Sequence, residues 1–236
     1  MPATEQTILL YIAFTQGRSE QNGGLSNLRA SSLHVYLAAI RSLHVMNGYP
    51  LPPISTPRVQ MALKAIEEAG TEPMRKSPIT YELLSRICQS FSYDYNDKVW
   101  RAIFTLGFFG ALRGAEYALD VAQSGVIMST PLLLGQISFG EKDSSSFMTV
   151  KVRRSKTMPH GFTKVIGCTT TSVCAVCAMK AYLLTRRSIG LLFPQSYVFQ
   201  FSDGKVLTKS MLNSKIKTLV SMFGLDPTKL DRKSVV

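Results

Sequence analysis

The spacing of apolar and polar residues predicts helices throughout the first third of the chain. Apolar residues recur at helical spacing in "TEQTILLYIAFTQG" (4–17) and "SSLHVYLAAIRSLHVMNG" (31–48), and both segments end at a glycine. A third segment, "STPRVQMALKAIEEAG" (55–70), begins with Ser and Thr as candidate caps, has a proline in its first turn and stops at a glycine. The connecting stretches "NGGLS" and "YPLPP" are turn sequences. This part therefore predicts a small helical domain.

The pattern changes after the polar, proline-containing stretch "TEPMRKSP". Helices are predicted from Thr80 and over 97–113, and the second is apolar on nearly every side and ends in Arg113. "FMTVKVRRSK", "TMPHG" and "FTKVIGC" then predict a strand, a turn and a strand, with basic side chains on one face. "SVCAVCAMKAYLLTRRS" and "LTKSMLNSKIKTLVSMFG" predict two further helices.

The order of these elements predicts a fold that is mainly α with a small β-sheet, in the α+β class. Residues 1–72 form a helical domain, 73–78 a linker, and 79–236 a second domain of helices around a short sheet.

Charge indicates a polyanionic partner. The chain carries 27 basic and 15 acidic residues, a net charge of +12. From Ser144 to Ser202 it contains no Asp or Glu. The basic residues in that span are Lys151, Arg153, Arg154, Lys156, Lys164, Lys180, Arg186 and Arg187. A segment this one-sided repels itself unless an anion lies against it, and the phosphates of a nucleic acid are a common solution. The alternative is a generally basic, solvated surface.

Three of the four cysteines, Cys168, Cys174 and Cys177, lie in "CTTTSVCAVC". The apolar residues that follow suggest the buried start of a helix, in which cysteine acts as a small hydrophobic residue. Zinc or redox chemistry is the alternative, but a second C-x-x-C is missing and His160 is the one nearby histidine. We therefore expect no metal and no cofactor.

No feature points to a membrane or to secretion. No apolar run reaches the roughly 18 residues that a membrane span needs, and the N-terminus lacks the basic region of a secretory signal. We expect no membrane partner and a protein that is not secreted. It would be nuclear in a eukaryote and cytoplasmic otherwise.

Two basic residues are candidates for phosphate chemistry. An arginine that closes a buried helix needs a negatively charged partner. For Arg113 this partner is either Glu116, three residues further along, or a phosphate group of a ligand. Lys156 lies at or next to the tip of the predicted hairpin, beside Arg153 and Arg154. It is either a solvated turn lysine or a group that reaches a nucleic-acid backbone.

Together these segments resemble the tyrosine recombinases, the phage-integrase family. "FTLGFFGALRGAEYALD" resembles the family's G-L-R-x-x-E-L segment, and "RRSKTMPHG" resembles its β-hairpin lysine. Four more segments resemble the family in the right order, so the likeness covers most of the chain and is closest to the integrases of eukaryotic mobile elements. They are "VYLAAIRSLHVMNGYPLPP", "RKSPITYELLSRI", "CAVCAMKAYLLTRRSIGLLFP" and "KSMLNSKIKTLVSMFGLDPTK".

The resemblance implies a core-binding, SAM-like domain at 1–72 and a catalytic domain at 79–236. In this family a tyrosine attacks DNA and becomes linked to its 3′-phosphate, two arginines stabilise the charge, and the hairpin lysine protonates the leaving oxygen. By resemblance, Arg113 is the first arginine, Lys156 the general acid and Glu116 a structural residue. The expected partners are double-stranded DNA, contacted by Arg41, Lys151, Arg153, Arg154, His160 and Lys164, and other recombinase protomers.

The chain departs from the family pattern at its end. Lys233 stands where the resemblance places a histidine, and Val236 stands where it places the second arginine. All nine tyrosines lie upstream of these positions. We therefore expect a C-terminally truncated, DNA-binding recombinase relative that does not cleave DNA alone. The alternatives are an active recombinase completed by a partner chain and a basic RNA-binding protein.

Overall fold

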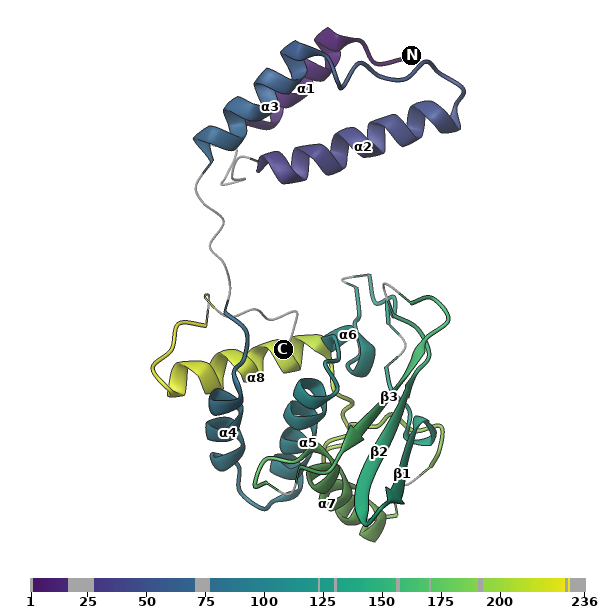
Figure 1. Cartoon of the computed structure of the whole chain (residues 1–236), viewed down its shortest axis with the longest axis vertical. Coiled ribbons are helices and arrows are strands. Elements are labelled where there is room, and N and C mark those ends of the chain that lie inside the picture. The colour runs from purple at the N-terminus through teal and green to yellow at the C-terminus, as the bar shows by residue number, and fades with distance from the viewer. Residues whose placement is uncertain are drawn as a thin grey trace. The chain divides into compact units, whose positions relative to one another are not determined.

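The computed structural model describes residues 2–16, 28–70, 77–122, 124–129, 131–155, 158–169, 171–190, 193–227 and 229. The chain divides into two compact units, Met1–Pro73 and Met74–Val236 (Figure 1). The predicted boundaries 1–72, 73–78 and 79–236 stay a prediction, and most of the expected linker lies outside the described residues. Within the described part of the chain, no helix has both the length and the apolar character needed to cross a membrane.

The first unit is a bundle of three helices, as the periodicity predicted. They are α1 (Glu5–Gln16), α2 (Ala30–Met46) and α3 (Pro57–Ala69), and Pro57 opens α3 at its first helical position. Their shared core consists of Ile8, Ile12, Leu33, Leu37, Val59 and Leu63. Buried His44 accepts a hydrogen bond from the main-chain N–H of Ala3 (3.1 Å) and lies 2.6 Å from the carbonyl oxygen of Pro50. It thereby connects the residues before α1 to the α2–α3 loop.

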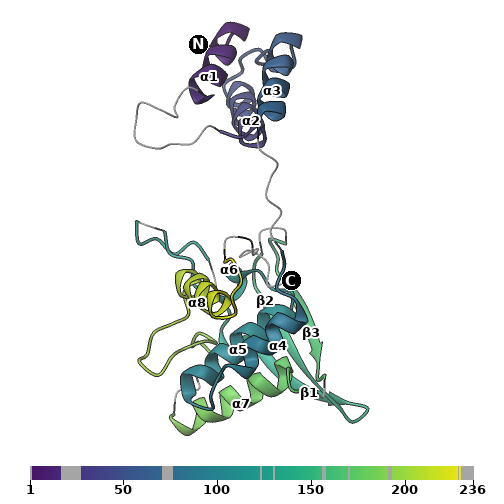
Figure 2. The ribbon, with the colours of Figure 1, turned by 90° about the vertical axis from the view of Figure 1, so that its left-hand side faces the viewer.

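The second unit is built around one buried helix, α5 (Tyr95–Phe109). Asp94 caps α5 by accepting the N–H of Asp97 (2.8 Å), and Thr80 caps α4 (Tyr81–Gln89) in the same way. Helices α7 (Ala175–Ser188) and α8 (Lys209–Met222) complete the main helices of the described chain. Helix α7 packs along α5 and also contacts the sheet, as the turned view shows (Figure 2). The α5 residues Trp100, Ile103, Phe104 and Leu106 belong to the resulting core.

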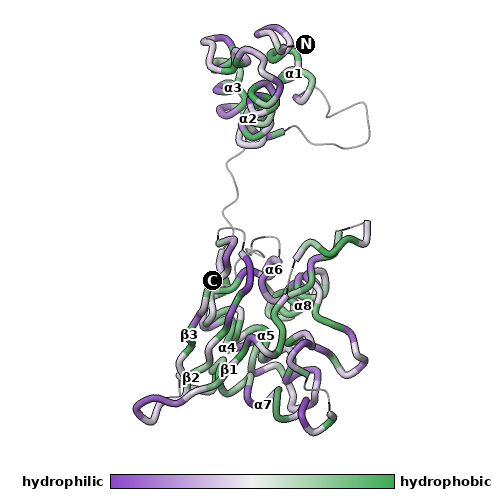
Figure 3. Tube along the Cα trace, turned by 90° about the vertical axis from the view of Figure 1, so that its right-hand side faces the viewer, coloured by the Kyte–Doolittle hydropathy of each residue, from purple (hydrophilic) through white to green (hydrophobic). Residues whose placement is uncertain are grey.

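A three-stranded antiparallel sheet lies beside these helices, in the order β1 (Ile137–Lys142), β2 (Ser145–Val152), β3 (Phe162–Gly167). Met148, Val150 and Val152 alternate along β2 and are buried in the core. The β1–β2 turn is hydrophilic (Figure 3) and has positive φ at Asp143 and Ser144, as a tight hairpin turn requires. The α+β prediction and the predicted hairpin, now β2 and β3, are confirmed.

Two local predictions were wrong, and two short elements were not predicted. Helix α5 ends at Phe109 and does not continue to Arg113, because Gly110 caps it and Ala111 takes a positive φ of 48°. Arg113 instead precedes α6 (Gly114–Tyr117), a four-residue helix that the sequence did not reveal. Strand β1, with its weak alternation "ISFGEK", was also missed.

The second wrong prediction is the single basic face of the hairpin. Lys151 is paired with Thr163 and Lys164 with Val150, and paired residues project on the same side of a sheet. Because neighbouring strand residues alternate between faces, Lys151 and Lys164 lie on opposite faces. Lys164 instead lies on the face of Phe162, with its Nζ 5.8 Å from the centre of that ring.

Candidate functional site

Arg113 lies at a junction between two segments that are distant in the sequence. Its main-chain N–H donates to Glu116 Oε2 (2.8 Å), and the N–H of Glu116 donates to the carbonyl oxygen of Arg113 (2.8 Å). These reciprocal bonds close the first turn of α6, as a capping box does. Buried Leu112 anchors the chain just before the junction.

The guanidinium of Arg113 reaches the end of the β2–β3 hairpin. Its Nη1 donates to Ser155 Oγ (3.1 Å) and lies 3.4 Å from Glu116 Oε1. Ser155 Oγ in turn donates to the same Glu116 oxygen (2.7 Å). The three side chains therefore form one network across 42 residues of sequence. We call Arg113, Glu116 and Ser155 the arginine network.

Burial differs strongly within the arginine network. The Glu116 side chain is 5% exposed and that of Arg113 is 50% exposed. A buried carboxylate must be paired or hydrogen-bonded, and Glu116 meets that need with both of its network partners. Half of the Arg113 side chain is exposed, so it can meet an anion in solution. Glu116 thus holds Arg113 in place, and the arginine presents charge at the surface.

The hairpin turn is fixed by the backbone on both sides. The N–H groups of Ser155 and Gly161 both donate to the carbonyl oxygen of Met158 (3.0 Å each). Gly161 has φ +75°, and a Cβ there would lie 2.1 Å from the carbonyl oxygen of Val152. Lys156, the expected general acid, directly follows Ser155 in the sequence but lies outside the described residues, as do Lys233 and Val236.

The structure leaves the other predicted DNA contacts exposed. Arg41 lies on α2 in the first unit, and Lys151, Arg153, Arg154, His160 and Lys164 lie along or beside the hairpin of the second unit. The hairpin set is split between two faces, as the register requires. Arg153, Arg154 and His160 lie beside the strands near the turn that carries Ser155, whereas Lys151 and Lys164 lie on opposite faces of the strands.

Two tyrosines of the second unit are in the core. Tyr182 is fully buried, and its hydroxyl donates to the carbonyl oxygen of Val198 (2.8 Å). Tyr117 follows Glu116 and is also buried; burial, followed by the nearby Glu116 charge, raises the pKa of its hydroxyl above the usual range. Neither hydroxyl is accessible for attack on a DNA phosphate.

The fold brings together the three cysteines for which the sequence left zinc or redox chemistry as the alternative, Cys168, Cys174 and Cys177. The prediction that the C-x-x-C begins a helix is confirmed, and Cys174 is buried, but Cys177 is exposed. Burial opposes ionisation of Cys174, yet hydrogen bonds from its neighbours, that of the Cys177 N–H first, lower the pKa of this thiol to about 6. Partial burial of the thiol, followed by the hydrogen bonds and charges of Cys174 and Cys168, raises the pKa of Cys177.

Comparison with known proteins gives a limited picture. No protein-family model and no curated protein matches the chain. Among solved structures, XerA recombinase is 16% identical with a TM-score of 0.40, covering 98% of this chain and 66% of its own. The complex of XerH site-specific recombinase bound to difH substrate is 13% identical with a TM-score of 0.38, covering 92% and 60% respectively. This chain thus spans less than two thirds of the length of either, and TM-scores below 0.5 do not by themselves establish a shared fold.

Proposed function

We propose that the chain is a DNA-binding protein of the tyrosine-recombinase type, in which Arg113 and Lys156 contact one backbone phosphate. The hydrogen bond of 3.1 Å between Arg113 Nη1 and Ser155 Oγ carries this proposal. It brings the residue directly before Lys156 to the arginine, although 42 positions separate the two. This contact between Arg113 and the residue before Lys156 supports the proposal.

The chemistry of this place suits a phosphodiester. A guanidinium fork is well shaped for phosphate oxygens, and an ammonium group adds a second positive charge. Arg153, Arg154 and His160 lie exposed near the same turn and add to the attraction of a polyanion. Most such contacts go to the backbone and position the duplex without reading its sequence.

We further propose that this chain binds duplex DNA without cleaving it. Its sequence has Lys233 and Val236 where the resemblance places a histidine and the second arginine. Loss of one group that stabilises the charge in a transition state typically lowers the rate by about 10²–10³-fold. Tyr117 and Tyr182 are buried, so their hydroxyls cannot reach a DNA phosphate.

The direct test is duplex binding by fluorescence anisotropy over a range of salt concentrations. Arg113→Ala and Lys156→Ala should each weaken binding to unrelated duplexes by a similar factor and reduce the salt slope by about 1. Lys142→Ala is the matched control, because Lys142 pairs with Ser145 at the other end of β2, about 23 Å along the strand from Val152. Equal affinities for all three variants would reject the phosphate site.

Cleavage needs a separate measurement. Incubation with a nicked duplex that traps a covalent protein–DNA adduct should give no adduct with this chain. An adduct on denaturing gels would overturn the binding-only proposal while leaving the phosphate site intact.

A further inference from the structure

Three thiols from two separate segments meet at the start of α7. Cys168 directly follows β3, whereas Cys174 is the N-cap of α7 and Cys177 lies in its first turn. Cys168 Sγ lies 3.5 Å from Cys174 Sγ and 3.6 Å from Cys177 Sγ, and all three sulfur atoms lie within 4.8 Å of one another. We call them the thiol cluster.

The spacing of the thiol cluster matches shared coordination of one metal ion. Tetrahedral zinc with zinc–sulfur bonds of about 2.3 Å places its sulfur ligands about 3.8 Å apart. The two shortest separations fall only a few tenths of an ångström below that value. A disulfide, in contrast, needs about 2.05 Å between its sulfur atoms. The third alternative is that the reduced thiols simply fill apolar space in the core. Cys177 is exposed and therefore does not fill such a space.

Backbone contacts hold the thiol cluster in place. The N–H of Cys168 donates to the carbonyl oxygen of Ser146 on β2 (2.8 Å), which fixes the first thiol against the sheet. The N–H of Cys177 donates to Cys174 Sγ (3.5 Å), a bond that orients this sulfur atom. Thr169 and Thr171 both donate to the carbonyl oxygen of Val173, which braces the connecting loop.

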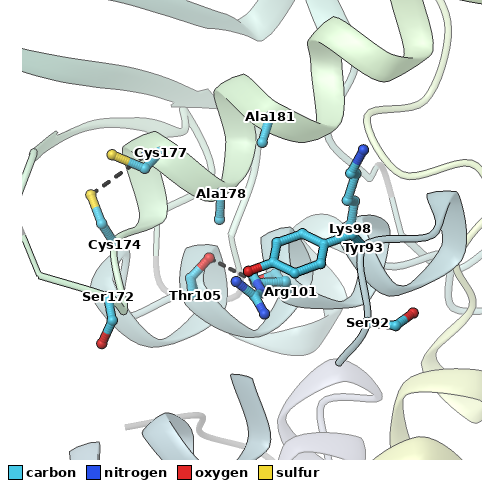
Figure 4. Close-up of a pocket in the computed structure, with 10 residues that line it drawn as sticks. All are labelled: Ser92, Tyr93, Lys98, Arg101, Thr105, Ser172, Cys174, Cys177, Ala178 and Ala181. Atoms are coloured by element: carbon cyan, nitrogen blue, oxygen red, sulfur yellow. Dashed lines mark hydrogen bonds between the residues drawn. The ribbon is translucent and has the colours of Figure 1, made fainter. Parts of the chain in front are cut away.

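The fourth coordination position faces solvent. Within the described part of the chain, no His, Asp or Glu joins the three cysteines to complete a site. A cavity of about 200 Å³ borders Cys174 and Cys177, between α5 and α7 (Figure 4), and Cys177 is exposed. Water therefore has access to the thiol cluster. Arg101 lines the same cavity, where its guanidinium donates to the carbonyl oxygens of Cys88 (2.8 Å) and Phe91 (3.3 Å).

We propose that Cys168, Cys174 and Cys177 bind one zinc ion, with water as the fourth ligand, and that this ion fastens the end of β3 to the start of α7. Soft thiolate ligands select zinc over hard cations such as Mg²⁺ or Ca²⁺. Binding forms three zinc–sulfur bonds and releases the remaining thiol protons to solvent, without any change of oxidation state. The site lies at the end of β3 away from Phe162 and the turn near Arg113, so it is independent of the phosphate site.

The test uses the whole chain, produced with zinc in the medium and purified without chelator. Elemental analysis should give about one zinc per chain, and Co²⁺ exchanged for zinc should give the thiolate charge-transfer and strong visible absorption of a tetrahedral site. Loss of a residue that only supports a metal ligand weakens metal affinity by roughly 10–100-fold. Cys168→Ser and Cys177→Ser each remove a ligand itself, so each should weaken metal affinity by more than that. Cys88→Ala is the matched control, because Cys88 lies in α4 outside the thiol cluster, and it should retain the full equivalent.

Three results would overturn the proposal. One is metal-free protein whose thermal midpoint does not rise with added zinc, because an ion that binds the folded state must stabilise it. The second is equal zinc in the wild type and in both serine variants, which would identify an adventitious ion. The third is titration of two thiols instead of four in unreduced, denatured protein, which would identify a disulfide. Exposed Cys177 keeps the test usable should Cys168→Ser fail to fold.

Discussion

Ser155→Ala tests the contact on which the phosphate site depends. The hydroxyl of Ser155 donates to Glu116 Oε1 (2.7 Å) and accepts from Arg113 Nη1 (3.1 Å). Replacement by alanine removes both bonds and changes little else, because the side chain loses one oxygen atom. Ser155 is 7% exposed, so water cannot easily replace the lost group.

The expected cost follows from the charges of the two partners. A hydrogen bond to a charged group contributes about 1.5–3 kcal/mol, and a neutral one about 1 kcal/mol. The bond to buried Glu116 belongs to the first class. The bond from half-exposed Arg113 contributes less, because solvent hydrates the guanidinium once the serine is gone. We therefore expect Ser155→Ala to lower the free energy of unfolding of the second unit by about 2 kcal/mol.

Urea unfolding followed by tryptophan fluorescence measures this loss in the correct unit. The chain has one tryptophan, Trp100, which lies in α5 against Phe104 and Phe201. Its emission therefore reports the second unit alone. Ser188→Ala is the control, because Ser188 makes a single bond to a main-chain carbonyl at an exposed site (2.7 Å), and its loss should cost less than about 1 kcal/mol.

A double-mutant cycle with Glu116→Gln makes the test specific. If the two side chains contact each other, their effects should depart from additivity by about 0.5–3 kcal/mol. A Ser155→Ala effect no larger than the control, together with additive effects in the cycle, would refute the arginine network. The hairpin turn would then have no demonstrated connection to Arg113, and the proposed phosphate site would lose its main support.

Three further substitutions have outcomes that the structure fixes. Gly161→Ala should lower the free energy of unfolding by more than the roughly 0.4–1 kcal/mol of an ordinary glycine effect, because φ is +75° and the new Cβ would overlap the carbonyl oxygen of Val152. A urea midpoint within error of the wild type would contradict the turn geometry. Arg186→Leu should lower the free energy of unfolding by about 3 kcal/mol or more, since this fully buried side chain donates to several carbonyl and side-chain oxygens. A soluble variant with unchanged stability would contradict this buried hydrogen-bonding role. Asp120→Asn should lower the free energy of unfolding by at most about 1 kcal/mol, and by less at high salt, because the 2.7 Å ion pair of Asp120 with Lys209 is partly exposed. A larger loss in urea unfolding that does not depend on salt would show that the pair acts as a buried one.

The sequence predicted the parts of the fold that local chemistry determines. Apolar spacing located the main helices to within a few residues, and Thr80 and other capping residues set where they begin. Alternation in β2 and the glycine at 161 located the hairpin because both act within a few residues of themselves. The α+β class followed from these local signals alone.

What the sequence could not predict depends on contacts between distant segments. Arg113 looked like the last residue of a long apolar helix, because no local rule shows that Ala111 would take a positive φ and end it. Ser155 carries no signal of its own, since its role exists only when the hairpin meets α6. The sequence placed Cys168, Cys174 and Cys177 in one stretch, but it could not show that their sulfur atoms meet, because the end of β3 must first bring Cys168 to the start of α7.

Arg113 has two alternative roles, as the partner of Glu116 or as a ligand for phosphate. The bond lengths within the arginine network distinguish between these roles. Glu116 already accepts two short bonds, from the Arg113 N–H (2.8 Å) and from the Ser155 hydroxyl (2.7 Å), whereas the guanidinium lies at 3.4 Å. A half-exposed ion pair of that length contributes about 0–1 kcal/mol to stability. The half-exposed Arg113 side chain can therefore meet a phosphate in addition to its contacts with Glu116 and Ser155. It follows that Arg113→Ala should cost little stability and much DNA affinity, whereas Ser155→Ala should do the reverse.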